Sequence, residues 1–206
     1  RVQLIMIKVF IGFDAREHVA FHVLSHSILK RTSQPVSITP IVLDNIKELM
    51  WRERHPLQST DFSFSRFLTP YLSNYEGWSI FMDCDMLVVE DIAELMSARD
   101  PAYAVQVVKH SHIPKSDTKF LGQVQTKYEK KNWSSVMLFN NTLCKSLTLD
   151  YVNSASGLEL HQFKWLRSEQ LIGEIPKKWN YLVDVDDPIN EVANYMDKNH
   201  PGSYYI

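Results

Sequence analysis

The sequence predicts a single α/β domain with a mainly parallel central sheet flanked by helices. Short apolar segments typical of buried strands alternate with segments whose apolar residues recur at helical spacing, and this alternation is typical of parallel sheets. The 206 residues can bury one sizeable core. Neither a linker nor an internal repeat divides them, so we expect one domain over residues 1–206.

The first predicted elements are a strand, a helix and a second strand. Residues 7–13 form a short apolar run of the kind found in buried strands. Residues 16–31 carry apolar side chains at helical spacing and predict a helix. A second strand is expected over residues 36–44, and Pro40 favours a place for it at the edge of the sheet.

The middle of the chain continues the alternation. Residues 62–75 have helical spacing, and Pro70 predicts a kink or a late start of that helix. A strand over 78–89 and a helix over 90–98 should follow, then two more strands over 102–110 and 134–140. The longest polar segment, residues 109–132, is expected to be either a functional loop or an exposed connection.

Composition excludes several classes of protein. A net charge of −2 with 22% charged residues gives no bulk attraction to nucleic acid or to acidic membranes. Cys84 and Cys144 are too few for a disulfide framework, so we expect two free thiols. The chain has neither an apolar run of the roughly 20 residues that a membrane span needs nor a signal-peptide cleavage site. We therefore expect a cytoplasmic protein without an integral membrane segment, which could bind the inner membrane peripherally.

The segment SIFMDCDMLVVEDI places Asp83 and Asp85 inside an otherwise apolar stretch. In an extended strand these two side chains share a face and Cys84 turns away. Buried carboxylates need compensation, and a hard cation such as Mg²⁺, Mn²⁺ or Ca²⁺ would supply it. The alternative is that both residues cap a turn at a strand end. Because Asp184 and Asp186 repeat the pattern, the pattern alone does not decide.

The surroundings of this pair resemble the family 8 glycosyltransferases. The resemblance rests on SRFLTPYLSNYEGWSIFMDCDMLVVEDIAEL, GFDAREHVAFHVLSHSI and NWSSVMLFN, which occur in the family's order between about residues 7 and 183. The last two segments are most similar to a bacterial branch of the family. The resemblance implies a Rossmann-like GT-A fold and transfer of a sugar from a nucleotide-sugar donor, with UDP favoured. A glycan or lipid-linked acceptor, polysaccharide biosynthesis and retention of configuration are implied with it.

The resemblance also implies a metal site. Asp83 and Asp85 match the residues that hold Mn²⁺ or Mg²⁺ in the family, with Asp83 also contacting the ribose. The metal would neutralise charge on the departing diphosphate. Arg66 matches a basic residue near the phosphates, and its apolar surround favours a buried partner. The family's third ligand is a His near the C-terminus, but His200 lacks the matching pattern, so we expect that this motif is missing.

Further donor contacts are implied at two places. Gly12, Phe13 and Asp14 match the segment that grips the base and ribose, although FDAREH replaces the family's usual Asp-Asp-Asn-Tyr-like run. Gly12 could equally be a turn residue, and Phe13 could stack on the base or belong to the core. Trp133 and Ser134 match a segment that lines the sugar. Trp133 stands where the family has Asn, and could be a platform for a sugar or a core residue.

Glu169 and Gln170 match the family's Asp-Gln pair beside the reacting carbon. A carboxylate there could stabilise positive charge or act as the nucleophile of a retaining reaction. Glu169 could also be a surface residue. His110 and His112, with strand-like spacing, could contact phosphate or acceptor, or could be solvated.

Two other functions remain open. A catalytically degenerate module that binds nucleotide sugars or glycans is the first alternative, since Trp133 departs from the family pattern. A sugar nucleotidyltransferase is less favoured. It normally needs a Gly-rich phosphate loop after the first strand, and IGFDAREH contains one glycine.

Overall fold

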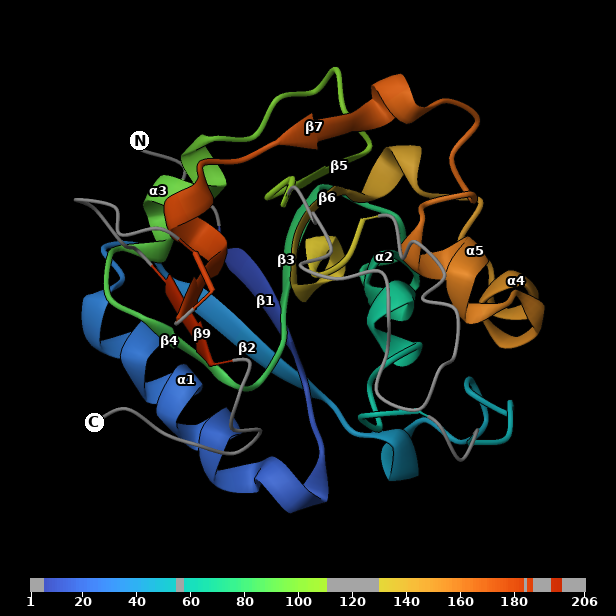
Figure 1. The fold of residues 1–206 in the computed structure, drawn as a ribbon, viewed down its shortest axis with the longest axis horizontal. Helices are drawn as coiled ribbons and strands as arrows, with labels where there is room; N and C mark the ends of the chain where they lie inside the picture. Colours follow the sequence, from blue (N-terminus) through green and yellow to red (C-terminus); the bar gives the residue numbers. More distant parts are fainter. Residues whose placement is uncertain (1–5, 55–57, 111–129, 184, 187–193, 198–206) are drawn as a thin grey trace.

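A six-stranded sheet forms the centre of the computed structural model, which describes residues 6–54, 58–110, 130–183, 185–186 and 194–197 (Figure 1). Three of its five strand pairings are parallel, and β6 (Val136–Asn140) runs antiparallel to both of its neighbours. The predicted α/β class with a mostly parallel sheet is confirmed. In spatial order the strands are β2 (Val36–Ile41), β1 (Ile7–Gly12), β3 (Trp78–Met82), β6 (Val136–Asn140), β5 (Val105–Val107) and β7 (Ile172–Glu174).

A smaller sheet contains β4 (Met86–Val88), β9 (Asn194–Asp197) and β8 (Tyr181–Val183). The single strand predicted over 78–89 is therefore wrong, because β3 and β4 belong to different sheets. The backbone N–H of Asp83 still donates to Ser135 O at 2.9 Å, after which the chain leaves the large sheet. Burial on both sides of this break made the two strands look like one in the sequence.

The predicted helices are present but shorter. The helix α1 (His18–Arg31) follows the 3₁₀ turn η1 (Ala15–Glu17). The region 62–75 contains the 3₁₀ turn η3 (Ser65–Leu68) and then α2 (Thr69–Leu72), which starts late, as Pro70 predicted. The remaining α-helices are α3 (Ile92–Ser97), α4 (Leu149–Ser154) and α5 (Gly157–His161). In Figure 1, α4 and α5 lie on the opposite side of the view from α1.

Short 3₁₀ turns connect several of these elements. They are η2 (Leu43–Asn45), η4 (Trp133–Ser135), η5 (Asn141–Leu143), η6 (Glu169–Leu171) and η7 (Lys177–Asn180). As Pro40 predicted, β2 is an edge strand. Most of the predicted loop over 109–132 lies outside the described residues, as do His112, Asp184 and His200.

The core lies between the central sheet and the helices. Val9, Ile11, Ile80 and Phe139 are fully buried within it. Both cysteines are buried free thiols, as predicted. Within the part of the chain that the structure describes, none of the helices is long and apolar enough to cross a membrane.

Strand register brings three candidate segments to one edge of the large sheet. Ile11 of β1 pairs with Met82 of β3, so the chain after each strand emerges at the same place. Met82 also lies opposite Val136, the first residue of the antiparallel β6. The segments 12–14, 83–85 and 133–135 therefore meet at the carboxyl ends of β1 and β3, where open α/β sheets bind ligands.

Candidate active site

The connection between β3 and β4 carries the two aspartates. Asp83 is 6% exposed and Asp85 is half-buried. Between them, the thiol of Cys84 donates to Glu17 Oε2 at 3.4 Å. Burial raises the pKa of Glu17, and the charges of Asp14 and Asp83 raise it further, although the Cys84 hydrogen bond opposes them. The carboxyl groups of Asp14, Glu17 and Asp83 are therefore close enough to influence one another near this connection.

Arg66 is the buried cation of the site. Its Nη1 lies 2.7 Å from Asp83 Oδ1 and donates to Ser134 O at 2.8 Å. The guanidinium also lies 5.3 Å from the ring of Phe62 and 5.2 Å from the ring of Phe81. The predicted buried partner of Arg66 is thus Asp83, and the same guanidinium ties β3 to the segment before β6.

Ser134 has a second partner that sequence reasoning missed. Its Oγ lies 2.8 Å from Nδ1 of His161, at the end of α5. Burial, together with the charge of Arg66, lowers the pKa of His161 to about 3, so the ring is neutral at physiological pH. One signal could have located this residue, because Ser156 and Glu159 form a capping box and thereby predict a short helix that ends near His161.

The carboxylate of Asp14 holds the chain after β1 in place. Its carboxylate is fully buried and accepts from Arg16 Nη2 at 2.6 Å and from the Asp61 backbone N–H at 3.2 Å. The hydrogen bond from the Arg16 side chain lowers the pKa of Asp14 to about 2. This carboxylate therefore anchors the 59–61 segment to the end of β1.

The two residues before Asp14 pack against aromatic rings. Phe13 makes an edge-to-face contact with Phe21, with 5.6 Å between the ring centroids. A Cβ atom at Gly12 would lie 2.3 Å from the ring of Phe62. Gly12 therefore allows the close approach of the Phe62 ring. The sequence had suggested a donor contact or a turn for Gly12, and it had not suggested this packing role.

Trp133 lies in a cluster of charged side chains. Its Nε1 donates to His110 O at 3.0 Å, and Nζ of Lys109 and Nζ of Lys130 each lie 6.0 Å from its ring. Lys130 forms an ion pair with Glu169, which lies on η6. The hydrogen bond from Lys130 lowers the pKa of Glu169. The ion pair therefore links Glu169 to the segment that carries Trp133. Gln170, the exposed neighbour of Glu169, lies on the same turn, η6.

The second Asp-x-Asp pair behaves differently from the first. Oδ1 of Asp186 lies 2.9 Å from Lys177 Nζ, and its Oδ2 accepts from the backbone N–H of Leu182 at 2.8 Å. Asp186 therefore fixes the end of β8. This residue shows the structural role that the pattern alone could not exclude.

The aspartates offer hard oxygen ligands for a metal. Among the residues that the structure describes, no group of three or more His, Cys, Asp or Glu side chains is arranged to hold a metal ion. Mg²⁺ is often held by one or two carboxylates together with substrate phosphates and water. Asp83 and Asp85 fit that mode of binding, in which the substrate completes the coordination.

Comparison with solved structures defines the class of the fold. The chain is similar to the WbbM bifunctional glycosyltransferase, with a TM-score of 0.59 and 15% identity over 88% of this chain and 40% of that chain. Mouse xyloside xylosyltransferase 1 gives a TM-score of 0.59 and 11% identity over 98% and 100% of the two chains. The galactosyltransferase LgtC, in complex with donor and acceptor sugar analogues, gives 0.59 and 8% over 93% and 87%. The fold is that of the GT-A glycosyltransferases.

Comparison of sequences identifies the family. The chain belongs to the family of Protein CDI from Arabidopsis thaliana, to which it is 50% identical over 179 residues, covering 85% of this chain and 69% of that protein. No protein-family model matches the chain. Because this relative is a plant protein, it gives no support to the bacterial branch expected from the sequence.

Proposed function

We propose that this protein is a hexosyltransferase that moves a sugar from a nucleoside-diphosphate donor, with UDP favoured, to a glycan or lipid-linked acceptor. The supporting observation is the buried pair of Arg66 and Asp83 at the carboxyl end of β3. This is the edge where α/β sheets bind ligands, and a guanidinium there suits a diphosphate. The GT-A fold supports the same class of reaction.

In this proposal Asp83 and Asp85 hold Mn²⁺ or Mg²⁺ together with the donor's phosphates. The ion, when bound, would neutralise negative charge on the diphosphate leaving group. Arg66 keeps the Asp83 carboxylate in place through the 2.7 Å contact and adds fixed positive charge beside the aspartates. The residues proposed to line the donor at the carboxyl ends of β1 and β3 are Gly12, Phe13 and Ser134. The buried carboxylate of Asp14 holds the neighbouring chain in place there.

Glu169 is proposed to stabilise positive charge on the reacting sugar carbon. A glutamate carboxyl is ionised at neutral pH, and the hydrogen bond from Lys130 lowers the pKa of Glu169 further. The same ion pair reduces its strength as a nucleophile, which favours an electrostatic role over a covalent one. Gln170 is proposed to orient the donor sugar beside it, and retention of configuration is proposed from the family resemblance alone.

Thermal unfolding with UDP, GDP, CMP or ADP, each with and without Mn²⁺, tests the proposal. We expect one nucleotide to raise the unfolding midpoint in the presence of metal, because a ligand that binds the folded state stabilises it. The increase should disappear in Asp85→Asn and persist in Asp150→Asn, which alters an exposed carboxylate on α4. A nucleotide shift that is equal in all three chains, or absent from all of them, would contradict the assigned site.

A module that binds nucleotide sugars without catalysis is the second candidate. It is favoured by the Lys130–Glu169 ion pair, because the positive charge of Lys130 offsets the negative charge of the carboxylate expected beside the reacting carbon. Release of UDP from a UDP-sugar distinguishes the two functions. Metal-dependent release that is lost in Asp85→Asn supports the transferase, whereas metal-dependent binding without release supports the module.

A further inference from the structure

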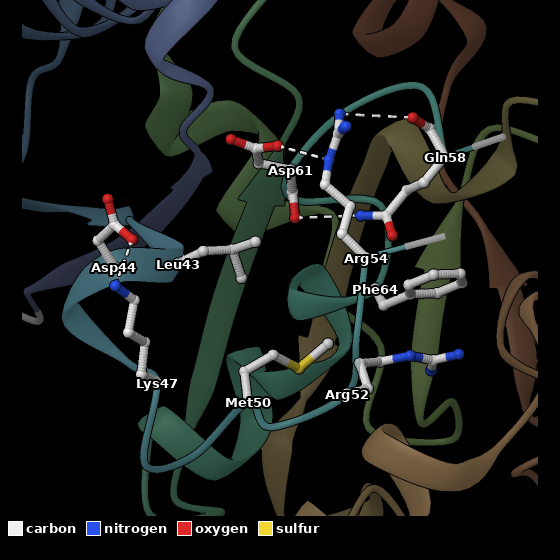
Figure 2. A pocket seen from close by; sticks show the side chains of 9 residues that line it. All are labelled: Leu43, Asp44, Lys47, Met50, Arg52, Arg54, Gln58, Asp61 and Phe64. Carbon is white, nitrogen blue, oxygen red and sulfur yellow. Dashed lines mark hydrogen bonds and ion pairs between the residues drawn. The ribbon is translucent and has the colours of Figure 1, made fainter. Parts of the chain in front are cut away.

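A separate pocket lies beside the candidate active site, between η2 and the segment that leads to Arg66 (Figure 2). Its volume is about 190 Å³. The residues that line it are Leu43, Asp44, Lys47, Met50, Arg52, Arg54, Gln58, Asp61 and Phe64. Apart from Asp61, whose backbone N–H donates to Asp14, neither the sequence motifs nor the proposed mechanism uses these residues.

One part of the pocket lining is apolar and firmly held. Leu43, Met50 and Phe64 are half-buried, so each presents part of its surface to the pocket. The guanidinium of Arg52 lies 3.8 Å from the centroid of the Phe64 ring. That guanidinium is fixed in turn by hydrogen bonds to Val152 O and Ala155 O at the end of α4. The aromatic ring is therefore positioned before any ligand arrives.

The other part of the lining is a connected set of planar polar groups. Arg54 Nε lies 3.0 Å from Asp61 Oδ1, and Gln58 Nε2 donates to Thr60 O at 2.8 Å. Figure 2 shows Arg54, Gln58 and Asp61 joined to one another along one side, with Leu43, Met50 and Phe64 below them in the view. Because Gln58 Nε2 donates to the backbone carbonyls of Thr60 and Asp61, the amide offers its oxygen as an acceptor. The guanidinium of Arg54 has further N–H donors, and the carboxylate of Asp61 has further acceptor sites, so the set can bind hydroxyl groups of one ligand.

The size of the pocket suits a single ring. An engineered protein cavity of roughly 150 Å³ binds benzene. At about 190 Å³ the pocket suits one six-membered ring with its substituents and is too small for a nucleoside diphosphate. A nucleobase would favour apolar surface on both of its faces, but here the apolar residues oppose a polar side. A pyranose has an apolar CH face and hydroxyl groups around its edge, which matches this lining.

Residues that line the pocket also contact residues of the candidate active site. The backbone N–H of Asp61 donates to Asp14 at the end of β1. The Phe64 ring lies 6.3 Å from His161, which contacts Ser134. Phe64 also stands two residues before Arg66. A sugar in the pocket would therefore sit next to the edge where the donor is proposed to bind.

We propose that this pocket binds one pyranose unit of the acceptor glycan. This inference rests on the proposed function, because it assigns the pocket to the second substrate of the transferase. Arg54, Gln58 and Asp61 select the hydroxyl pattern of the sugar, and Phe64 with Met50 packs against its apolar face.

Saturation-transfer NMR on the full chain tests the assignment with small probes. The probes are the methyl β-glycosides of glucose, galactose, xylose and glucuronic acid, with UMP as a probe of the donor side. We expect at least one glycoside to bind and its affinity to fall about tenfold in Arg54→Ala, the loss expected for one charge-assisted contact. Gln58→Ala should also weaken it. UMP binding should be unchanged in both variants, and Lys145→Ala, an exposed lysine away from this pocket, should affect neither probe.

Three outcomes would overturn the assignment. In the first, none of the glycosides binds the unmutated chain, and in the second, glycoside affinity is equal in the unmutated chain and in both pocket variants. In the third, Arg54→Ala abolishes UMP binding, which would make the pocket a base site. Failure of UMP to bind the unmutated chain while a glycoside binds the pocket would count against the proposed donor and leave the pocket as a sugar site. Unfolding midpoints of both variants verify that they remain folded.

Discussion

The guanidinium of Arg66 lies 2.7 Å from the carboxylate of Asp83, and both side chains are more than nine-tenths buried. This contact joins the segment before α2 to the end of β3. It compensates the buried carboxylate of Asp83 within the protein itself. Asp85 is half-buried, so its side chain is more accessible to a metal than that of Asp83.

Removing Arg66 should destabilise the fold strongly. Arg66→Met leaves Asp83 buried without its cation, and breaking one partner of a buried pair typically costs about 3–5 kcal/mol. The free energy of unfolding in urea measures the loss. The control is Lys47→Met, whose partner Asp44 is 82% exposed, so that change should cost less than about 1 kcal/mol.

The double variant Arg66→Met with Asp83→Asn separates charge from packing. Because it removes both charges, it should be more stable than Arg66→Met alone. Equal stability of the single and double variants would mean that Arg66 acts mainly through its contacts with Ser134 and the Phe62 and Phe81 rings.

His161 should make stability depend on pH in the mildly acidic range. Its pKa is about 3 in the folded chain against an ordinary value of 6.5. Between these values the unfolded chain binds a proton that the folded chain does not, so stability falls as the pH drops below 6.5. The slope from this residue is about 1.4 kcal/mol per pH unit. Asp14, with a pKa of about 2, adds its loss only below about pH 4.

Unfolding free energies of the unmutated chain and of His161→Asn between pH 4.5 and 7 measure this effect. Asparagine retains an amide that can hydrogen-bond to Ser134 but does not titrate. The variant should therefore have a flatter profile, whereas His26→Asn, at an exposed position on α1, should retain the slope. Parallel profiles for the unmutated chain and His161→Asn would contradict the prediction.

Gly12 should tolerate no side chain. An added Cβ would lie 2.3 Å from the ring of Phe62, which is 1% exposed and has little room to move. Overpacking of this kind costs about 1–3 kcal/mol. Gly12→Ala should lower the unfolding midpoint, and combining it with Phe62→Leu should cost less than the sum of the two single changes. Strict additivity in denaturant unfolding would show that the alanine is accommodated elsewhere.

The sequence predicted the elements whose hydrophobic period is regular. The first strand, α1 and the edge strand β2 were expected close to their observed bounds, because each buries a face with a clear spacing. The break between β3 and β4 could not be predicted in this way. Periodicity reports that residues are buried, but it does not report which of two sheets buries them.

The sequence indicated candidate residues for the site, but it did not predict which of them contact one another. Asp83 and Arg66 were both singled out, and the structure adds that they bind each other. Asp14 was expected to face a ligand, yet Arg16 and Asp61 occupy its carboxylate. The capping box of Ser156 and Glu159 could have indicated the short helix that ends at His161. The contacts of His161 could not be predicted in this way, because Ser134 and Arg66 are distant from it in sequence.

The ion pair of Lys130 with Glu169 should control the titration of the glutamate. Lys130 is 8% exposed in its side chain, whereas Lys164, whose Nζ lies 3.9 Å from Glu169, is 53% exposed and better screened by water. Lys130→Met should therefore raise the pKa of Glu169 toward its ordinary range, and Lys164→Met should raise it less. The ¹³C chemical shift of the Glu169 carboxyl carbon, followed against pH, measures both changes. Because Glu169 is 71% exposed, the loss of stability should stay below about 1 kcal/mol. A larger effect from Lys164 than from Lys130 would contradict the assignment of Lys130 as the main cause of the lowered pKa of Glu169.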